Sequence, residues 1–299
     1  MSTWLAYPYG IAYLLTHHGM KTGCDIVVYS QIPIGSGLSS SAALACSLGL
    51  GLCELYSLGL SRLDIAQMVR QVENTFAGVP SGILDPLASL TGKLDNLVYL
   101  DTLDNSYRYI PFNPTSCDLE LLLIDSNVRH RLSTSQYAQR SQECLEICEN
   151  LSVTSLREVS LDNLESALEL ISSPVLKRRC RHVVTENRRV ELAVECIENQ
   201  DFVQLGALLT QGHESLRDDY EVSVPELDMA VEVAITRGCL GARMTGGGFG
   251  GSAIALVPKG SSEAVRKAIS EAYDKHGYAL PDFSIPRPSQ GATRQEDYC

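Results

Sequence analysis

A loop rich in glycine and serine, between an expected strand and an expected helix, has residues suited to binding an anion. It runs from 33 to 41 and reads Pro-Ile-Gly-Ser-Gly-Leu-Ser-Ser-Ser. Gly35 and Gly37 allow positive φ and a close approach of the backbone to a ligand. The N–H groups that open the following helix have no partner inside it, and with the helix dipole they attract anions. The residues predicted to bind phosphate are Gly35, Ser36, Gly37, Leu38, Ser39, Ser40 and Ser41.

The three consecutive serines at 39–41 distinguish this loop from an ordinary turn. A single serine N-cap is enough to begin a helix. The loop lacks the lysine of G-x-x-x-x-G-K-[ST] and is not a Walker A loop, and it lacks the third glycine of the dinucleotide fingerprint. A structural turn is the alternative for a lone G-x-G. Three hydroxyls that can donate to phosphate or hold a metal favour a ligand-binding loop instead.

A second glycine cluster lies at 245–252, immediately before an expected strand, and reads Thr-Gly-Gly-Gly-Phe-Gly-Gly-Ser. Five of the six residues from 246 to 251 are glycine. Such a run costs conformational entropy and supplies no packing surface. A plain hairpin would need only one or two glycines, so we expect this loop to face a ligand.

Two carboxylates are candidates for metal binding and proton transfer. Glu73 lies late in an expected helix, and Asp85 ends the segment Gly-Val-Pro-Ser-Gly-Ile-Leu-Asp at 78–85. A carboxylate beside a triphosphate is repelled unless a divalent cation lies between them, so Glu73 is a natural Mg²⁺ ligand. Apolar neighbours are expected to desolvate Asp85 partly and to raise its pKa, which suits a base for an attacking hydroxyl. Taken alone, Glu73 also fits a solvated helix charge and Asp85 a loop cap.

The elements expected around these residues alternate between strands and helices, which predicts an α/β or α+β protein with two layered domains. A strand at 25–30 precedes the phosphate loop, and a helix from Ala42 to Leu58 follows it. A second helix, from Ser61 to Ala77, has a capping box at its start. The two prolines of 111–116 mark the best linker. The other expected elements are strands at 97–100, 107–110, 119–124 and 252–257 and helices at 133–150, 161–171, 175–200, 203–216 and 261–276.

Length and composition exclude several classes of protein. The 299 residues leave room for two domains, and 44% hydrophobic with 20% charged residues is ordinary for a globular protein. A net charge of −12 argues against nucleic acid or an anionic membrane as partners. No apolar run reaches the ~18–20 residues needed to cross a bilayer. Ten cysteines without C-x-x-C spacing predict reduced thiols and a cytoplasmic protein.

Together these motifs resemble those of the GHMP small-molecule kinases, and within them the galactokinase family. Residues 34–42 are similar to the superfamily's phosphate-binding motif, and residues 245–251 to its C-terminal glycine motif. The longer stretches that resemble galactokinases are 73–85, 126–130 with Ser135-Gln136-Tyr137, and 213–223. The likeness runs from about Trp4 to Gly291.

The resemblance implies a fold, an activity and a set of site residues. The fold is α+β with two domains: 1–113 is a shortened N-terminal domain like domain 2 of ribosomal protein S5, and 114–299 is a ferredoxin-like C-terminal domain. The activity is phosphorylation of the anomeric hydroxyl of galactose, with ATP and Mg²⁺ as cofactors, in the cleft between the domains. The implied roles are nucleotide binding by Gly35 to Ser41 with Gly247 and Gly248, Mg²⁺ binding by Ser41 and Glu73, catalysis by Asp85, and sugar binding by Gly82, Asp85 and Tyr137.

Some residues depart from the family pattern. Galactokinases carry a Gly-Glu-His-Thr-Asp-Tyr motif preceded by a catalytic arginine, and nothing in 1–23 matches it. Asn74 stands where the family has histidine, and Pro86 where it has glutamine. Loss of a cationic stabiliser can slow phosphoryl transfer ~10³-fold or more. We therefore expect the 299-residue chain to bind nucleotide weakly and to turn over slowly, and its shortened sheet to expose an unpaired edge.

Two alternatives stay open from the sequence. One is a non-catalytic sensor or regulator that keeps the kinase fold to bind sugar or nucleotide. The other is a GHMP kinase for a different sugar or a mevalonate-like alcohol, although residues 215–223 weigh against it. The expected partners are a small-molecule sugar and ATP, and a regulator would in addition bind a partner protein.

Overall fold

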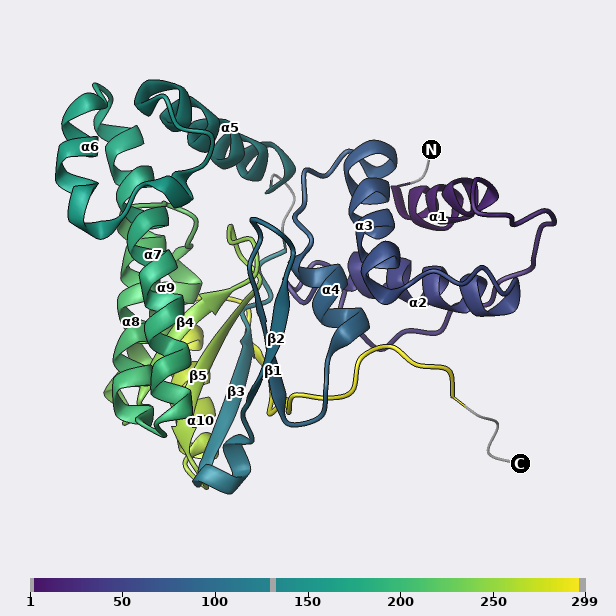
Figure 1. Cartoon of the computed structure of the whole chain (residues 1–299). Helices are drawn as coiled ribbons and strands as arrows, with labels where there is room; N and C mark the ends of the chain where they lie inside the picture. The colour runs from purple at the N-terminus through teal and green to yellow at the C-terminus, as the bar shows by residue number, and fades with distance from the viewer. Residues whose placement is uncertain (1–2, 130–132, 296–299) are drawn as a thin grey trace. The chain divides into compact units, whose positions relative to one another are not determined.

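The computed structural model describes residues 3–129 and 133–295, which form two compact units. The first unit comprises Met1–Asn113 with Arg287–Cys299, and the second comprises Pro114–Pro286. Figure 1 draws the first part of the chain in purple and blue and most of the second unit in teal to green. The sequence predicts one domain from 114 to the end, whereas the structure groups the last residues with the first unit.

Specific contacts hold the C-terminal tail to the first unit. The Arg287 guanidinium donates two hydrogen bonds to the Asp95 carboxylate, each 2.6 Å long. Farther along, the Gly291 amide donates to the Gly92 carbonyl at 2.8 Å. Figure 1 draws the tail as a yellow segment without helix or strand. These bonds explain why the tail belongs to the first unit despite following the second in sequence.

Helices and one antiparallel hairpin make up the described part of the first unit. Its elements are α1 (Ala6–Thr16), α2 (Ser40–Leu55), α3 (Arg62–Val72), α4 (Leu84–Thr91), β1 (Asn96–Leu100) and β2 (Tyr107–Pro111), after a 3₁₀ turn at Thr3–Leu5. The helices share an apolar core that includes Ile11, Val69 and Leu87, all fully buried. The expected helix after the phosphate loop is present but ends at Leu55, three residues early.

Helix α3 begins as its sequence predicts. The Ser61 hydroxyl accepts from the Asp64 amide, and the Asp64 carboxylate accepts from the Ser61 amide at 2.9 Å, which confirms the capping box. After Val72 the helix widens into a π-helical turn, Glu73–Ala77, which ends at Gly78 with φ +72°. Such π turns often lie at functional sites because they redirect one side chain. Here the turn begins at Glu73.

The strand predicted at 25–30 is absent, and this prediction is wrong. Residues 23–31 form neither helix nor strand, and no strand within residues 3–129 and 133–295 pairs with them. Val27 and Tyr29 are 97% and 85% exposed. The β-branched composition favours an extended backbone, but a strand also needs a hydrogen-bonded neighbour. Without one among the described residues, the propensity alone does not make a strand.

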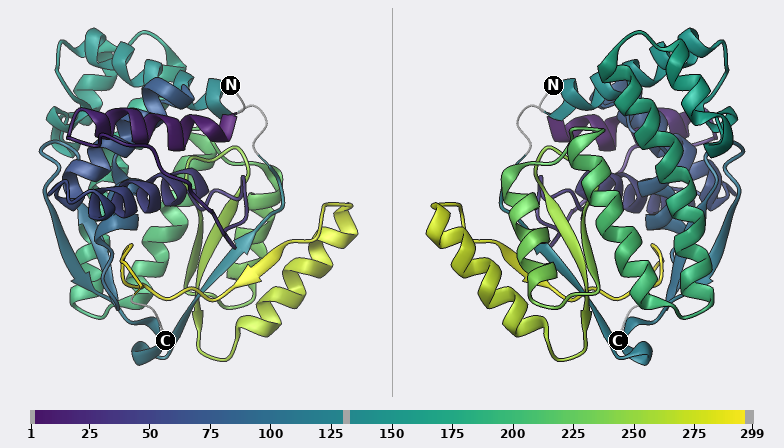
Figure 2. Two further views of the ribbon diagram at one scale, coloured as in Figure 1. Left: turned by 90° about the vertical axis from the view of Figure 1, so that its right-hand side faces the viewer. Right: turned by 90° about the vertical axis from the view of Figure 1, so that its left-hand side faces the viewer.

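The second unit contains a four-stranded antiparallel sheet with helices, and it confirms the α+β class. The strand order is β4-β5-β3-β6, and Figure 2 shows these strands side by side with α10 beside the β6 edge. The elements are β3 (Leu119–Asp125), α5 (Ser133–Leu151), α6 (Leu164–Leu170), α7 (Pro174–Glu198), α8 (Phe202–Asp218), α9 (Pro225–Thr236), β4 (Gly241–Thr245), β5 (Ser252–Pro258), α10 (Ser262–His276) and β6 (Asp282–Ser284), with 3₁₀ turns at Pro114–Cys117, Leu156–Glu158 and Leu161–Asn163.

The sheet of the second unit packs one face against an apolar core. Leu122 of β3, Met244 of β4 and Ala255 of β5 are fully buried there. Helix α8 crosses β4 at close range, because a Cβ on Gly206 would overlap the Leu240 carbonyl. This packing lies at the start of β4, and the second glycine cluster follows the other end of the strand, after Thr245. None of the described helices is both long and apolar enough to cross a membrane.

Candidate functional site

The phosphate loop of the first unit has an unusual backbone. Gly35, Gly37 and Ser39 have φ of +74°, +75° and +54°. Alternating left-handed residues turn successive N–H groups toward one side, which is the geometry of an anion-binding nest. Ser36 is fully buried and its hydroxyl donates to the Pro33 carbonyl at 2.9 Å, which closes the turn. The loop therefore leads directly into the N-terminus of α2 in a form that suits an anion.

Ser39 links this loop to Asp85. It occupies the N-cap position of α2, but its side chain makes no cap hydrogen bond. Its hydroxyl donates instead to Asp85 Oδ2 at 2.5 Å. A left-handed serine is strained, and such strain is concentrated at functional sites. The geometry directs the hydroxyl out of the helix and onto a carboxylate.

Asp85 lies in the first turn of α4 and is exposed. The expected desolvation by its apolar neighbours is therefore wrong. Leu84, the residue before it, is itself 52% exposed and does not cover the carboxylate, while Pro86 and Leu87 turn into the core. A general base must lie within hydrogen-bond reach of the hydroxyl whose proton it takes, and an exposed carboxylate is accessible to such a ligand.

Glu73 is buried and bound by two hydroxyls. Its side chain is 4% exposed, and its Oε1 accepts from the Ser41 hydroxyl at 3.0 Å. The Ser81 hydroxyl donates to Oε2. Burial raises the pKa of Glu73 above 4.5, the hydrogen bonds from Ser81 and Ser41 oppose that rise, and the nearby Asp85 charge adds to it. The two carboxylates thus lie close enough to influence each other.

The first unit therefore brings most of the predicted site residues together. Ser39, at the end of the loop, and Ser41, in the first turn of α2, each contact a different carboxylate. Hydroxyl and carboxylate oxygens form the hard donor set that Mg²⁺ prefers, usually with one or two carboxylates plus phosphate oxygens and water. No group of three or more His, Cys, Asp or Glu side chains in the described chain could hold a metal by itself. The residues fit an ion that a bound phosphate helps to hold.

Tyr7 of α1 belongs to the same group, and the sequence reasoning missed it. Burial raises the pKa of its hydroxyl, a hydrogen bond with Ser41 lowers it, and the Glu73 charge raises it. Tyr7 is therefore near both proposed metal ligands. In the sequence, Tyr7 is an aromatic residue that precedes Pro8 and belongs to no recognisable motif. The sequence therefore did not mark it as a site residue.

Gly82 lies in the loop before α4, on the exposed side. A Cβ on Gly82 would meet no atom within 4 Å, so packing does not require glycine there. The loop itself is fixed, because the Asn74 side chain donates to the Arg70 and Ser81 carbonyls at 2.7 and 3.1 Å. The open space at Gly82 is compatible with a ligand close to its backbone.

The second glycine cluster contacts the chain itself in the second unit. A Cβ on Gly248 would overlap the Val222 carbonyl, and one on Gly250 would lie 2.7 Å from the Val128 carbonyl. Close approach to protein backbone thus explains part of the glycine run. Gly247 differs, because a Cβ there would lie 3.4 Å from the Tyr137 ring. The structure brings Gly247 and Tyr137 together, and Ser135 and residue 130 of the neighbouring motif lie outside the side chains it describes.

Comparisons with known proteins agree on one family. The chain matches the models for the GHMP kinases N terminal domain over residues 6–93 and the GHMP kinases C terminal over 193–275. It is 42% identical over 294 residues to a galactokinase of Streptomyces coelicolor, covering 98% of this chain and 76% of that one. It is 40% identical over 278 residues to one of Thermotoga petrophila, covering 92% and 77%. The crystal structure of Lactococcus lactis galactokinase complexed with galactose matches with a TM-score of 0.93 at 34% identity, covering 98% of this chain and 76% of that chain.

Proposed function

This chain belongs to the galactokinase family of the GHMP kinases, and from that premise we propose that it phosphorylates the anomeric hydroxyl of galactose with ATP. The match to both family models bears out the predicted two-domain kinase fold. One observation carries the proposal for this chain's own residues. A loop shaped for anions places Ser39 on the Asp85 carboxylate and Ser41 on the Glu73 carboxylate.

Asp85 is the proposed base. In the transfer, the sugar oxygen bonds to the terminal phosphorus as the bond from that phosphorus to the bridging oxygen of ADP breaks. The proton of the sugar hydroxyl passes to Asp85. The Ser39 hydroxyl, 2.5 Å from Oδ2, orients the carboxylate for this step. Proton transfer by a positioned side chain contributes about 10²–10⁴-fold to such reactions.

The remaining roles follow the donor chemistry of each residue. The backbone of Gly35 to Ser41 would bind the nucleotide phosphates, with Gly247 and Gly248 as the second nucleotide-binding segment. Gly82 and Tyr137 would contact the sugar. Ser41 and Glu73 would hold Mg²⁺, which supplies positive charge that offsets the triphosphate when bound. Burial of Glu73 supports this role, because a buried carboxylate without a cation is costly.

A cytoplasmic location is part of the proposal. The nine described cysteines are all free thiols. Burial raises the pKa of Cys53 to about 11 and that of Cys239 likewise, which keeps these thiols protonated and unreactive. Free, unreactive thiols fit a reducing compartment.

Incubation of the 299-residue chain with galactose, ATP and MgCl₂ tests the function. We expect ADP release that requires galactose and yields a sugar 1-phosphate, identified by phosphorus NMR. Saturable binding of galactose and ATP without transfer would favour the sensor, and activity with a mevalonate-like alcohol but not galactose would contradict the proposed substrate.

A further inference from the structure

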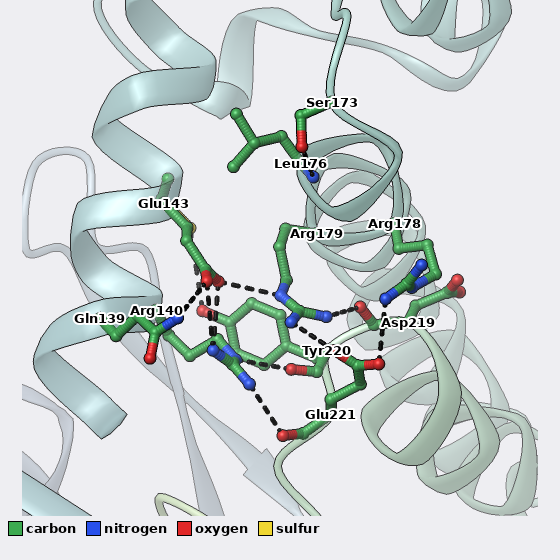
Figure 3. Close-up of polar contacts among 11 residues, drawn as sticks. Gln139, Arg140, Glu143, Ser173, Leu176, Arg178, Arg179, Asp219, Tyr220 and Glu221 are labelled. Carbon is green, nitrogen blue, oxygen red and sulfur yellow. Dashed lines mark hydrogen bonds and ion pairs between the residues drawn. The ribbon is translucent and has the colours of Figure 1, made fainter. Parts of the chain in front are cut away.

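A buried group of charges joins three segments of the second unit. Arg179 of α7, Glu143 of α5 and Arg140 of α5 are 2%, 8% and 9% exposed. Figure 3 shows their side chains meeting beside the segment that follows α8. Buried charges are costly unless they are paired. Here Glu143 accepts from Arg179 at 2.9 Å and pairs with Arg140 at 3.2 Å, so one carboxylate serves two guanidinium groups.

The Arg140 and Arg179 side chains both donate hydrogen bonds to backbone carbonyls of the segment after α8. Arg140 donates from Nε to the Tyr220 carbonyl at 2.7 Å and from Nη2 to the Glu221 carbonyl at 2.9 Å. Arg179 donates to the Asp219 carbonyl and to the Glu221 carboxylate, each at 2.5 Å. Figure 3 shows these contacts converging on the loop from two helices. The segment is therefore held at three consecutive residues.

This segment in turn holds the second glycine cluster. Val222 follows directly after Glu221, and its carbonyl accepts from the Phe249 amide at 2.6 Å. The Arg140 guanidinium also lies over the Phe249 ring, 5.8 Å from its centroid, and over the Tyr220 ring at 6.0 Å. Arg140 thus reaches the glycine cluster in two ways: through Val222 and through the Phe249 ring.

The same arginine is one turn from Tyr137 on α5. Residues three apart on a helix lie on neighbouring positions of one face. The Tyr137 ring would lie 3.4 Å from a Cβ on Gly247, so the ring and the glycine cluster are in close proximity. Arg140 therefore connects the helix that carries a proposed sugar-binding residue with the loop that carries proposed nucleotide-binding residues.

We infer that Arg140 is a positioning residue that sets the place of the Gly246–Phe249 backbone relative to Tyr137, and so controls nucleotide binding without touching nucleotide. The consequence for binding rests on the proposed function. An arginine is needed because a single side chain must hydrogen-bond to two carbonyls, pair with one carboxylate and lie over two aromatic rings. The planar guanidinium group, with several donors in fixed directions, can do this. A lysine ammonium is a point charge and cannot donate along the same fork.

Arg140→Gln tests this inference through hydrogen exchange and nucleotide affinity of the full chain. We expect exchange of the Phe249 amide to become at least about tenfold faster, while amides of the β3–β5 ladder keep their rates, because a local contact is lost and the core is not. By calorimetry, the dissociation constant for ATP with Mg²⁺ should rise by at least about fivefold, a loss of about 1 kcal/mol. Arg188→Gln, on α7 and paired with the exposed carboxylates of Glu191 and Glu195, is the matched control and should change neither quantity.

The outcomes separate this inference from the proposed function. Phe249 exchange that stays unchanged in Arg140→Gln overturns the inference, and so does faster exchange with unchanged ATP affinity. A wild-type chain that binds no nucleotide overturns the proposed function instead. Should the glutamine variant fail to fold, Arg140→Lys carries the same test, because it keeps a positive charge beside Glu143 and loses the fork to the Tyr220 and Glu221 carbonyls.

Discussion

Replacing Asp85 by asparagine is expected to lower galactose phosphorylation by about 10²–10⁴-fold while ATP affinity is unchanged or higher. The asparagine keeps a carbonyl oxygen that can accept from the Ser39 hydroxyl, so the loop geometry persists. It cannot take the proton of the sugar hydroxyl. Because the variant also removes one negative charge near the triphosphate, nucleotide binding should not suffer. The measurement is the galactose-dependent rate of ADP release beside an ATP titration by calorimetry.

Asp104→Asn is the matched control for this variant. Asp104 is an exposed aspartate of the same unit, in the turn between β1 and β2, where it accepts from the Ser106 amide at 2.8 Å. Its replacement should leave the rate and the affinity unchanged. If Asp85→Asn kept the wild-type rate, Asp85 would not be the base.

Glu73→Gln is expected to abolish the dependence of ATP binding on Mg²⁺ while leaving the fold at least as stable. Glutamine has nearly the same shape and its carbonyl can still accept from Ser41, but it carries no charge for a cation. Glu73 is 4% exposed and its ionised form is disfavoured by burial. Removing a buried charge that serves a ligand commonly raises stability and lowers function. Calorimetric titration with ATP, with and without MgCl₂, measures the Mg²⁺ dependence of binding. The melting temperature measures the stability of the fold.

The pH dependence of the Glu73 variant has a definite sign. The folded-state pKa of Glu73 is raised above the 4.5 of an ordinary glutamate, so the unfolded chain loses its proton first as the pH rises. Stability that the wild type has below pH 4.5 is therefore lost as the pH rises through the folded-state pKa. The melting temperature of Glu73→Gln should exceed that of the wild type by a margin that grows over this range. Glu54→Gln, at an exposed site on α2, is the matched control, and a Glu73→Gln margin that shrinks over this range would contradict the assigned sign.

The sequence predicted those parts of the fold in which local signals and tertiary packing agree. The capping box at Ser61 and the glycine that ends the π turn are local features, and both are present. Helix α1 is not among the predicted elements, and its sequence contains Pro8 and Gly10, two residue types that disfavour a helix interior. In the structure Pro8 lies in the first turn, where its missing N–H costs nothing. Gly10 lies against α3, since a Cβ there would be 2.8 Å from Val72. The requirement for glycine at position 10 becomes visible only in the packed structure.

For the candidate site, the sequence predicted which residues lie near one another better than it predicted how their side chains are exposed. The pairing of Ser41 with Glu73 follows the predicted proximity of loop and acid. The exposure of Asp85 does not, because apolar neighbours in sequence say nothing of which way each side chain turns. The glycine cluster at 246–251 is a similar case. Its glycines predict that the backbone approaches another group closely, but the sequence does not show whether that group is a ligand or the protein itself. Here Gly248 approaches Val222 of the same chain.

The most direct test of the central claim is to follow the backbone amides of an isotope-labelled chain by NMR while ATP and Mg²⁺ are added. We expect the amide resonances from Gly35 to Ser41 to shift first and most, and to saturate with the dissociation constant measured by calorimetry. In Glu73→Gln, the Mg²⁺-dependent part of these shifts should be lost. Saturable ATP binding that leaves those amides unshifted would contradict it.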